Sequence, residues 1–215
     1  MAELYAQRSC QLLCDRIMNQ IPRELRDLIY QHVVKADYIY VGPQYLINKG
    51  PPCENERNAY HWNVRYVRQA ILVELVQIWY GQSMFYFWDT KRNNEVIKSF
   101  MTSDRWGLGI NPFEYISKVK FDLVDDVLHY HQLGETRAKC TVATQHPVRM
   151  TAPLKVFAGF RFPSRVKFTI CIHTFGGLKS GCLSSIDLHH TLDEILKDLR
   201  MLHKAGYGFT VQWYI

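Results

Sequence analysis

Five side chains in the C-terminal third have the residue types that bind metal ions. Cys171 and His173 lie on one face of a predicted strand, and Cys182, His189 and His190 follow it. Thiolate and neutral imidazole are common ligands of zinc. Zinc ligands usually occur as close Cys-x-x-Cys or His-x₃-His pairs, and the chain contains neither spacing. We therefore interpret these residues as buried thiols and ordinary polar histidines, and we expect no metal.

Other catalytic patterns are equally incomplete. The chain has no Gly-x-Ser-x-Gly nucleophile elbow. The glycine-rich segment 175–181 places its lysine too close to the preceding glycine for a phosphate-binding P-loop. A pairing of Asp126 with His129 or His131 stays open at this level. We expect no catalytic residue, no cofactor and no small-molecule substrate, and hence a protein that is not an enzyme.

The composition is typical of a globular protein. The 215 residues are 47% hydrophobic and 13% aromatic, which argues against global disorder. The net charge of +6 is spread along the chain, so tight nucleic-acid binding is not expected. No window approaches the roughly 18 consecutive apolar residues of a membrane span, and the N-terminus lacks a secretory-signal pattern. We expect a soluble intracellular protein of the cytoplasm or nucleus, without membrane contact.

The cysteines do not suggest a disulfide framework. Six cysteines in 215 residues are too few for a disulfide-stabilised scaffold. Cys10 and Cys14 would face each other at i and i+4 on a helix, but they lack further partners. We expect all six thiols to be reduced.

The N-terminal region is predicted to be helical. Residues 4–18 carry an imperfect apolar stripe, and 21–34 begin with a proline and an acidic residue suited to a first helical turn. Leu25, Leu28, Ile29 and Val33 then recur at the spacing of one helical face. The sequence predicts a helical segment 1–36 and an α/β body 37–215, or one continuous domain over 1–215.

The body alternates predicted helices with predicted strands. The patterns indicate helices over 68–80, 94–101 and 153–160 and strands over 38–41, 84–88, 118–124 and 165–174. Gly81 suits a helix C-terminus, as does Gly206. Thr191 and Glu194 have the spacing of a capping box at a helix start, and an alternating strand ends the chain at 209–215. We expect an α+β or α/β fold, with a mixed sheet of strand–helix units layered by helices.

Several segments are similar to one family. Ile21-Pro22-Arg23-Glu24-Leu25 followed by Leu28-Ile29 resembles the leucine-proline-x-glutamate-leucine start of F-box segments. Residues 71–80 with 84–87, the segment 104–109 and the strand 119–123 are similar to a group of filamentous-fungal F-box-like proteins. The resemblance covers about the first 125 residues and, loosely, the final strand and helix units. It implies a protein–protein interaction protein, a substrate-recognition subunit of a ubiquitin ligase that docks a Skp-type adaptor.

Two interpretations of the segment 21–34 remain open. The resemblance implies that Ile21, Pro22, Leu25, Leu28 and Ile29 form an apolar patch for the adaptor. In the alternative, the chain is a stand-alone binding or structural α+β domain with no ligase link, and Leu25, Leu28 and Ile29 are buried against the sheet. We add one aromatic residue of the turn-rich segment, Trp106, as a partly exposed protein-binding residue under either interpretation.

Overall fold

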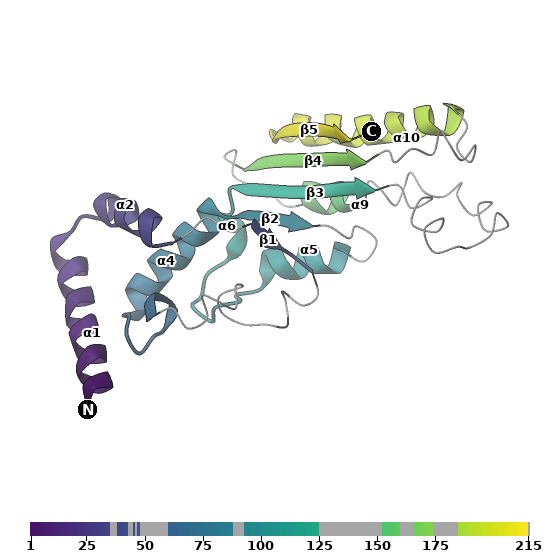
Figure 1. Cartoon of the computed structure of the whole chain (residues 1–215). Coiled ribbons are helices and arrows are strands. Elements are labelled where there is room, and N and C mark those ends of the chain that lie inside the picture. Colours follow the sequence, from purple (N-terminus) through teal and green to yellow (C-terminus); the bar gives the residue numbers. More distant parts are fainter. Residues whose placement is uncertain are drawn as a thin grey trace. The chain divides into compact units, whose positions relative to one another are not determined.

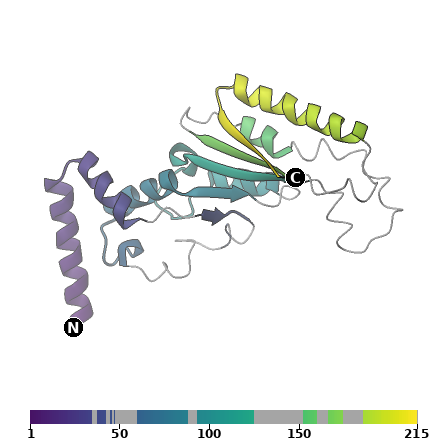
Figure 2. The same cartoon turned by 45° about the horizontal axis from the view of Figure 1, so that its top comes forward.

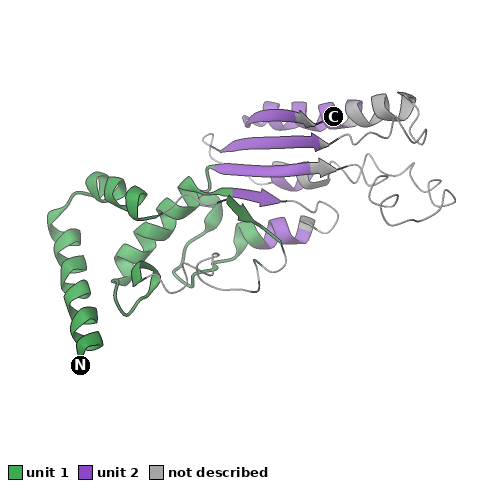
Figure 3. Ribbon diagram, in the orientation of Figure 1, with its two compact units in different colours: residues 1–84, 100–117 green, residues 85–99, 118–215 purple. Residues whose placement is uncertain are grey.

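The computed structural model describes most of the chain as two compact units. The described residues are 1–34, 38–42, 45, 47, 60–87, 93–124, 152–159, 166–173 and 185–214. Unit 1 comprises Met1–Met84 with Phe100–Ser117, and unit 2 comprises Phe85–Ser99 with Lys118–Ile215 (Figure 3). The predicted helical segment 1–36 belongs to unit 1.

Helices and strands alternate along most of the chain (Figure 1). In chain order, the elements are α1 (Ala2–Gln20), α2 (Arg23–Val33), β1 (Tyr38–Tyr40), the 3-10 helix η2 (Tyr60–Trp62), α4 (Gln69–Gln82), β2 (Met84–Phe87), α5 (Asn93–Thr102), α6 (Pro112–Tyr115), β3 (Lys118–Val124), α9 (Ala152–Ala158), β4 (Lys167–His173), α10 (Ser185–Lys204) and β5 (Gly208–Tyr214). The expected α/β or α+β fold with an N-terminal helical segment is confirmed.

Helix α4 forms the core of unit 1. Its buried residues lie on more than one side, as its apolar run predicts, and include Ile71, Leu72, Val76 and Trp79. The expected C-terminal cap at Gly81 is wrong, because α4 continues through Gln82. A Cβ at Gly81 would lie 3.7 Å from the Tyr115 carbonyl oxygen, an ordinary contact, so the helix passes through this glycine without strain.

The strands form a parallel sheet in the order β1-β2-β3-β4-β5. Lys118 of β3 is level with Lys167 of β4, which is level with Gly208 of β5, and both pairings are parallel. Successive strands are separated by segments that contain helices, and such crossovers allow parallel neighbours. The sheet is therefore parallel, where the sequence led us to expect a mixed one.

Apolar residues of β3 and β4 share one buried face of the sheet in unit 2. Val119, Phe121, Phe168 and Ile170 alternate onto one face and are buried. Phe157 of α9 packs on this face, with its ring stacked 5.4 Å from that of Phe121. Helices α9 and α10 lie on the same side of the sheet in Figures 1 and 2. The alternation predicted for β3 and β4 thus matches the burial of these residues.

The C-terminal helix begins earlier than the sequence suggested. Helix α10 starts at Ser185, so Thr191 and Glu194 lie within it and the predicted capping box is wrong. Its end is as predicted, because Gly206 adopts a left-handed φ of +89° after Lys204. Only glycine adopts this conformation readily, which is why the helix stops here and β5 follows.

Candidate protein-binding site

Helix α2 starts where the sequence places a proline. Pro22 is the residue before the first helical turn, and its carbonyl oxygen accepts hydrogen bonds from the backbone amides of Leu25 (3.1 Å) and Arg26 (3.0 Å). Glu24 adds a negative charge at the positive end of the helix dipole. The local sequence is therefore sufficient to begin the helix at this point.

The side of α2 that packs on α4 is not its most apolar side. Arg26, Tyr30 and Val34 recur every four residues and are all buried. Helices α2 and α4 contact each other within unit 1. A buried arginine is rare unless a carboxylate pairs with it. The partner must therefore come from α4.

Glu74 of α4 is that partner. Its carboxylate accepts two hydrogen bonds from the Arg26 guanidinium, Nε to Oε2 at 2.9 Å and Nη2 to Oε1 at 2.6 Å. Arg26 Nη1 also donates to the Ile21 carbonyl oxygen at 2.6 Å. The guanidinium of Arg23 lies 2.8 Å from Glu74 Oε1. Such a forked pair fixes orientation as well as contact, so it sets the rotation of α2 about its own axis.

The electrostatic environment keeps Glu74 ionised. Burial by itself raises the pKa of this carboxyl group. The hydrogen bonds from Arg26 and the positive charges of Arg23 and Arg26 together outweigh burial, and the pKa lies below its ordinary value. Burial and the nearby Glu74 charge raise the pKa of Tyr30 well above that of a free tyrosine. The contact between α2 and α4 is therefore built around one buried carboxylate.

The apolar stripe of α2 faces away from α4. Leu25, Leu28, Ile29 and Val33 are 52%, 55%, 41% and 43% exposed. We call these four residues the α2 stripe. At its N-terminal end Ile21 is half-buried and Pro22 is exposed. The burial of Leu25, Leu28 and Ile29 that the stand-alone alternative predicts is not found.

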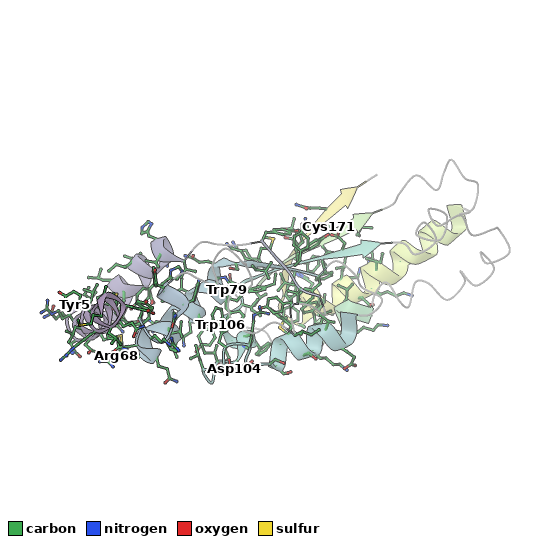
Figure 4. All side chains as sticks on the ribbon, turned by 60° about the horizontal axis from the view of Figure 1, so that its bottom comes forward. Tyr5, Arg68, Trp79, Asp104, Trp106 and Cys171 are labelled. Carbon is green, nitrogen blue, oxygen red and sulfur yellow. The ribbon has the colours of Figure 1, made fainter. Side chains whose placement is uncertain are left out.

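Helix α1 has the same inverted arrangement. Its polar side is held by the 60–68 region, where Arg68 donates to both carboxylate oxygens of Asp15 at 2.9 and 2.8 Å. Cys14 is the one buried residue of α1. Its apolar side chains are more than half exposed at Leu4, Tyr5, Leu12 and Leu13. Tyr5 and Arg68 are labelled in Figure 4. The exposed apolar surface of unit 1 thus includes both N-terminal helices.

Trp106 lies in a loop built around Asp104. The carboxylate of Asp104 accepts hydrogen bonds from the backbone amides of Trp106 (3.1 Å) and Gly109 (2.5 Å). Gly107 and Gly109 have φ values of +66° and +75°, so the tight turn requires glycine at both positions. This geometry holds the Trp106 side chain against α4.

Trp106 is half-buried as a residue, as expected, although its indole nitrogen is buried. The centroid of its ring lies 4.9 Å from that of the Trp62 ring, and Trp62 is buried. It lies 5.7 Å from the centroid of the buried Trp79 ring; Figure 4 labels Trp79 and Trp106. Trp106 therefore belongs to the edge of the unit 1 core, and only part of this residue is available to another molecule.

The cysteine and histidine candidates do not converge in the described part of the chain. Cys10, Cys14 and Cys171 are free thiols. Burial, the largest cause, raises the pKa of the Cys171 thiol, whose Sγ lies 3.5 Å from Gln212 Oε1. No group of three or more potential metal ligands occurs among the described residues. The side chains of residues 173, 182, 189 and 190, the segment 175–181 and the residues 126, 129 and 131 lie outside the described residues.

The residue pair that orients α2 was not predicted. Arg26 reads as a surface charge in the helical pattern, and Glu74 interrupts the most apolar segment of the chain. A lone carboxylate in an apolar helix is itself a signal, because it needs a buried cation. The sequence does not say which of the 26 lysines and arginines supplies that cation.

Comparisons with known proteins give no assignment. No family model, no curated protein and no solved structure matches the chain. Within the described residues, no helix combines the length and the apolarity needed to cross a membrane. The interpretation of the site therefore depends on its own geometry.

Proposed function

We propose that the protein is a non-enzymatic, F-box-like protein–protein interaction protein whose α2 stripe docks a Skp-type adaptor. In this role it is a substrate-recognition subunit of a ubiquitin ligase, acting in the cytoplasm or nucleus. The observation that carries the proposal is the outward orientation of Leu25, Leu28 and Ile29. They are the residues for which the resemblance implies adaptor contact, together with Ile21 and Pro22.

The energetics favour a partner on this surface. Fully burying a leucine or isoleucine side chain contributes roughly 1.5–3 kcal/mol. An amphipathic helix therefore normally turns its apolar side inward. Here the paired charges of Arg26 and Glu74 occupy the inward side, so α2 keeps several apolar side chains in water. A second protein that covers the stripe recovers this hydrophobic free energy.

The spacing of the stripe supports a helix-in-groove mode of binding. Such recognition uses apolar anchors at i, i+3, i+4 and about one turn later on one helix face. Leu25, Leu28, Ile29 and Val33 follow this spacing and are all exposed. Trp106 stays a proposed secondary contact, because the residue is only half-buried.

Binding of the purified chain to a purified Skp-type adaptor tests the proposal. We expect Leu28→Glu to weaken the affinity, measured by isothermal titration calorimetry, by about tenfold or more, because it buries a charge in an apolar contact. Val64→Glu is the matched control, because Val64 is 60% exposed in the same unit but lies outside α2. It should leave the affinity unchanged.

Two results contradict the proposal. One is a wild-type chain that does not bind the adaptor, which leaves the stand-alone interpretation. The other is equal binding by Leu28→Glu and wild type, which would place the contact elsewhere. Circular dichroism of both variants shows whether the helices are retained.

A further inference from the structure

In the described part of the sheet, β5 is an edge strand whose own residues lack the usual protective features. Gly208–Tyr214 follows β4 at the end of the strand order, and Figure 1 shows it at the border of the sheet. Its seven residues include no charged residue and no proline. Thr210, Val211 and Gln212 are exposed. Edge strands of soluble proteins are usually short, charged or interrupted by proline, because an open edge pairs with other strands.

Helix α10 flanks this edge and contributes to the same surface. The His203 ring lies 6.2 Å from the ring of Phe209 in β5. Asp198 lies on another side of α10, 3.9 Å from Lys155 of α9. Leu196 is 45% exposed and lies seven residues before His203, hence on the same side of the helix. The side of α10 next to β5 therefore presents an apolar residue.

We propose that a second copy of this chain pairs antiparallel with β5 about a two-fold axis, so that two sheets join edge to edge and the two α10 helices meet. The proposal goes beyond the docking function of α2. Closed two-fold dimers are the most common soluble oligomers, and each partner contributes the same surface. An uncharged strand suits such pairing, since no like charges oppose each other across the axis.

Two exposed charges of α10, Asp193 and Arg200, are complementary in this arrangement. Asp193 and Arg200 are both exposed and lie seven residues apart on one side of the helix. In an antiparallel pair centred between Leu196 and Lys197, Asp193 faces Arg200 of the partner subunit, and the reverse contact repeats it. The centre of the contact then carries Leu196 from each copy, flanked by the exposed Lys197. A second copy thus pairs Asp193 with Arg200 twice and covers Leu196.

One axis can serve the strand and the helix together. Helix α10 and β5 run in opposite directions (Figure 1), and the His203–Phe209 contact sets them level. From His203 to the centre between Leu196 and Lys197 is about 10 Å along a helix. From Phe209 to Val211 is about 7 Å along a strand. The two centres agree to within about one strand residue, so a single two-fold axis near Val211 relates both pairs.

An extended peptide from another protein fits this surface less well. A single added strand pairs with the backbone of β5. It leaves Leu196, Asp193 and Arg200 of α10 without a complementary helix. A second copy supplies both layers, which is why the observations favour it.

Light scattering coupled to size-exclusion chromatography, at several concentrations of the full chain, tests the proposal. We expect a dimer that dissociates on dilution. Asp193→Arg and Arg200→Asp should each weaken the dimer by about tenfold, because each places like charges across the axis. The double variant Asp193→Arg/Arg200→Asp should restore it, because it exchanges the two charges.

Two further variants separate the alternatives. Val211→Lys should give a monomer, because it places two charges opposite each other at the axis. Leu28→Glu on the α2 stripe should leave the dimer intact, so failure of adaptor docking and failure of dimerisation are distinguishable. The proposal is overturned by a wild-type monomer at every concentration, by a dimer insensitive to both single charge reversals, or by a dimer lost through Leu28→Glu. Because the charge reversals lie on an exposed surface, they test the contact even if Val211→Lys fails to fold.

Discussion

The buried carboxylate of Glu74 is the single group on which the presentation of α2 depends. It lies 5% exposed and receives hydrogen bonds from Arg26, whose guanidinium also reaches the Ile21 carbonyl oxygen. Removing one partner of a buried pair leaves the other charge without compensation, which is more costly than never having formed the pair. Glu74 therefore contributes both to stability and to the direction in which the α2 stripe points.

We expect Glu74→Gln to destabilise the protein at neutral pH by about 2 kcal/mol, because a charged hydrogen-bond acceptor is replaced by a neutral one. Equilibrium urea unfolding measures the difference. Glu24→Gln, an exposed glutamate on α2, is the control and should change stability by only about 0.5 kcal/mol. Equal losses for the two variants would contradict the role of Glu74.

The destabilisation caused by Glu74→Gln should depend on pH in one direction. The pKa of Glu74 is lower in the folded state than its ordinary value of 4.5. Its contribution to stability is therefore fully present above the unfolded pKa and is lost as the pH falls through the folded pKa. The difference between wild type and Glu74→Gln should shrink as the pH falls below 4.5. A difference that stays constant into this range would show that the ion pair is not its source.

At the scale of elements, two glycines near helix ends differ in whether the backbone tolerates a side chain. Gly206 has a φ of +89° after α10, where a side chain is strained whatever the space around it. Gly81 lies inside α4, where an added Cβ meets only the Tyr115 carbonyl oxygen at 3.7 Å. The same substitution should therefore act in opposite directions at the two positions.

We expect Gly206→Ala to destabilise the protein by about 1 kcal/mol, because alanine pays for the left-handed conformation. Gly81→Ala should stabilise it by up to about 1 kcal/mol through helix propensity. Urea unfolding of the two variants against wild type gives both values. A loss of stability at Gly81 would mean that the packing of α4 against Tyr115 is tighter than the distance indicates.

The elements also show how local patterns succeed and fail. Residues 118–124 alternate apolar and polar side chains, and β3 has these bounds. The capping-box spacing of Thr191 and Glu194 is equally regular, yet α10 begins at Ser185. The alternating pattern of a strand reflects the burial of one face along the whole strand. A capping-box spacing involves only two residues and holds only if the helix begins at the first of them. Period is therefore a better predictor here than a two-residue spacing.

At the scale of the whole molecule, charge limits the kinds of partner. The chain has 26 basic and 20 acidic residues and a pI near 9.0. Several of its cations already pair within the described units, including Arg23, Arg26, Arg68 and Lys155. The net positive charge attracts polyanions at long range. The four paired cations, however, do not form a dense phosphate-binding surface.

We expect nucleic-acid binding to be weak and abolished by salt. Fluorescence anisotropy with a labelled duplex should give dissociation constants above about 1 μM at physiological ionic strength. Binding in the nanomolar range that persists at this ionic strength would contradict the expectation. It would also point to a basic surface outside the described residues.

The sequence alone determined that an amphipathic helix follows Pro22 and that strands and helices alternate after it, because both follow from local periodicity. Only the tertiary structure decided which side of α2 faces solvent. Arg26 and Glu74 are separated by 48 positions in the chain, and their contact sets the helix rotation. Local periodicity depends on neighbouring residues and therefore cannot indicate a charge pair between residues so far apart. The exposure of the α2 stripe is decided only when α2 packs on α4.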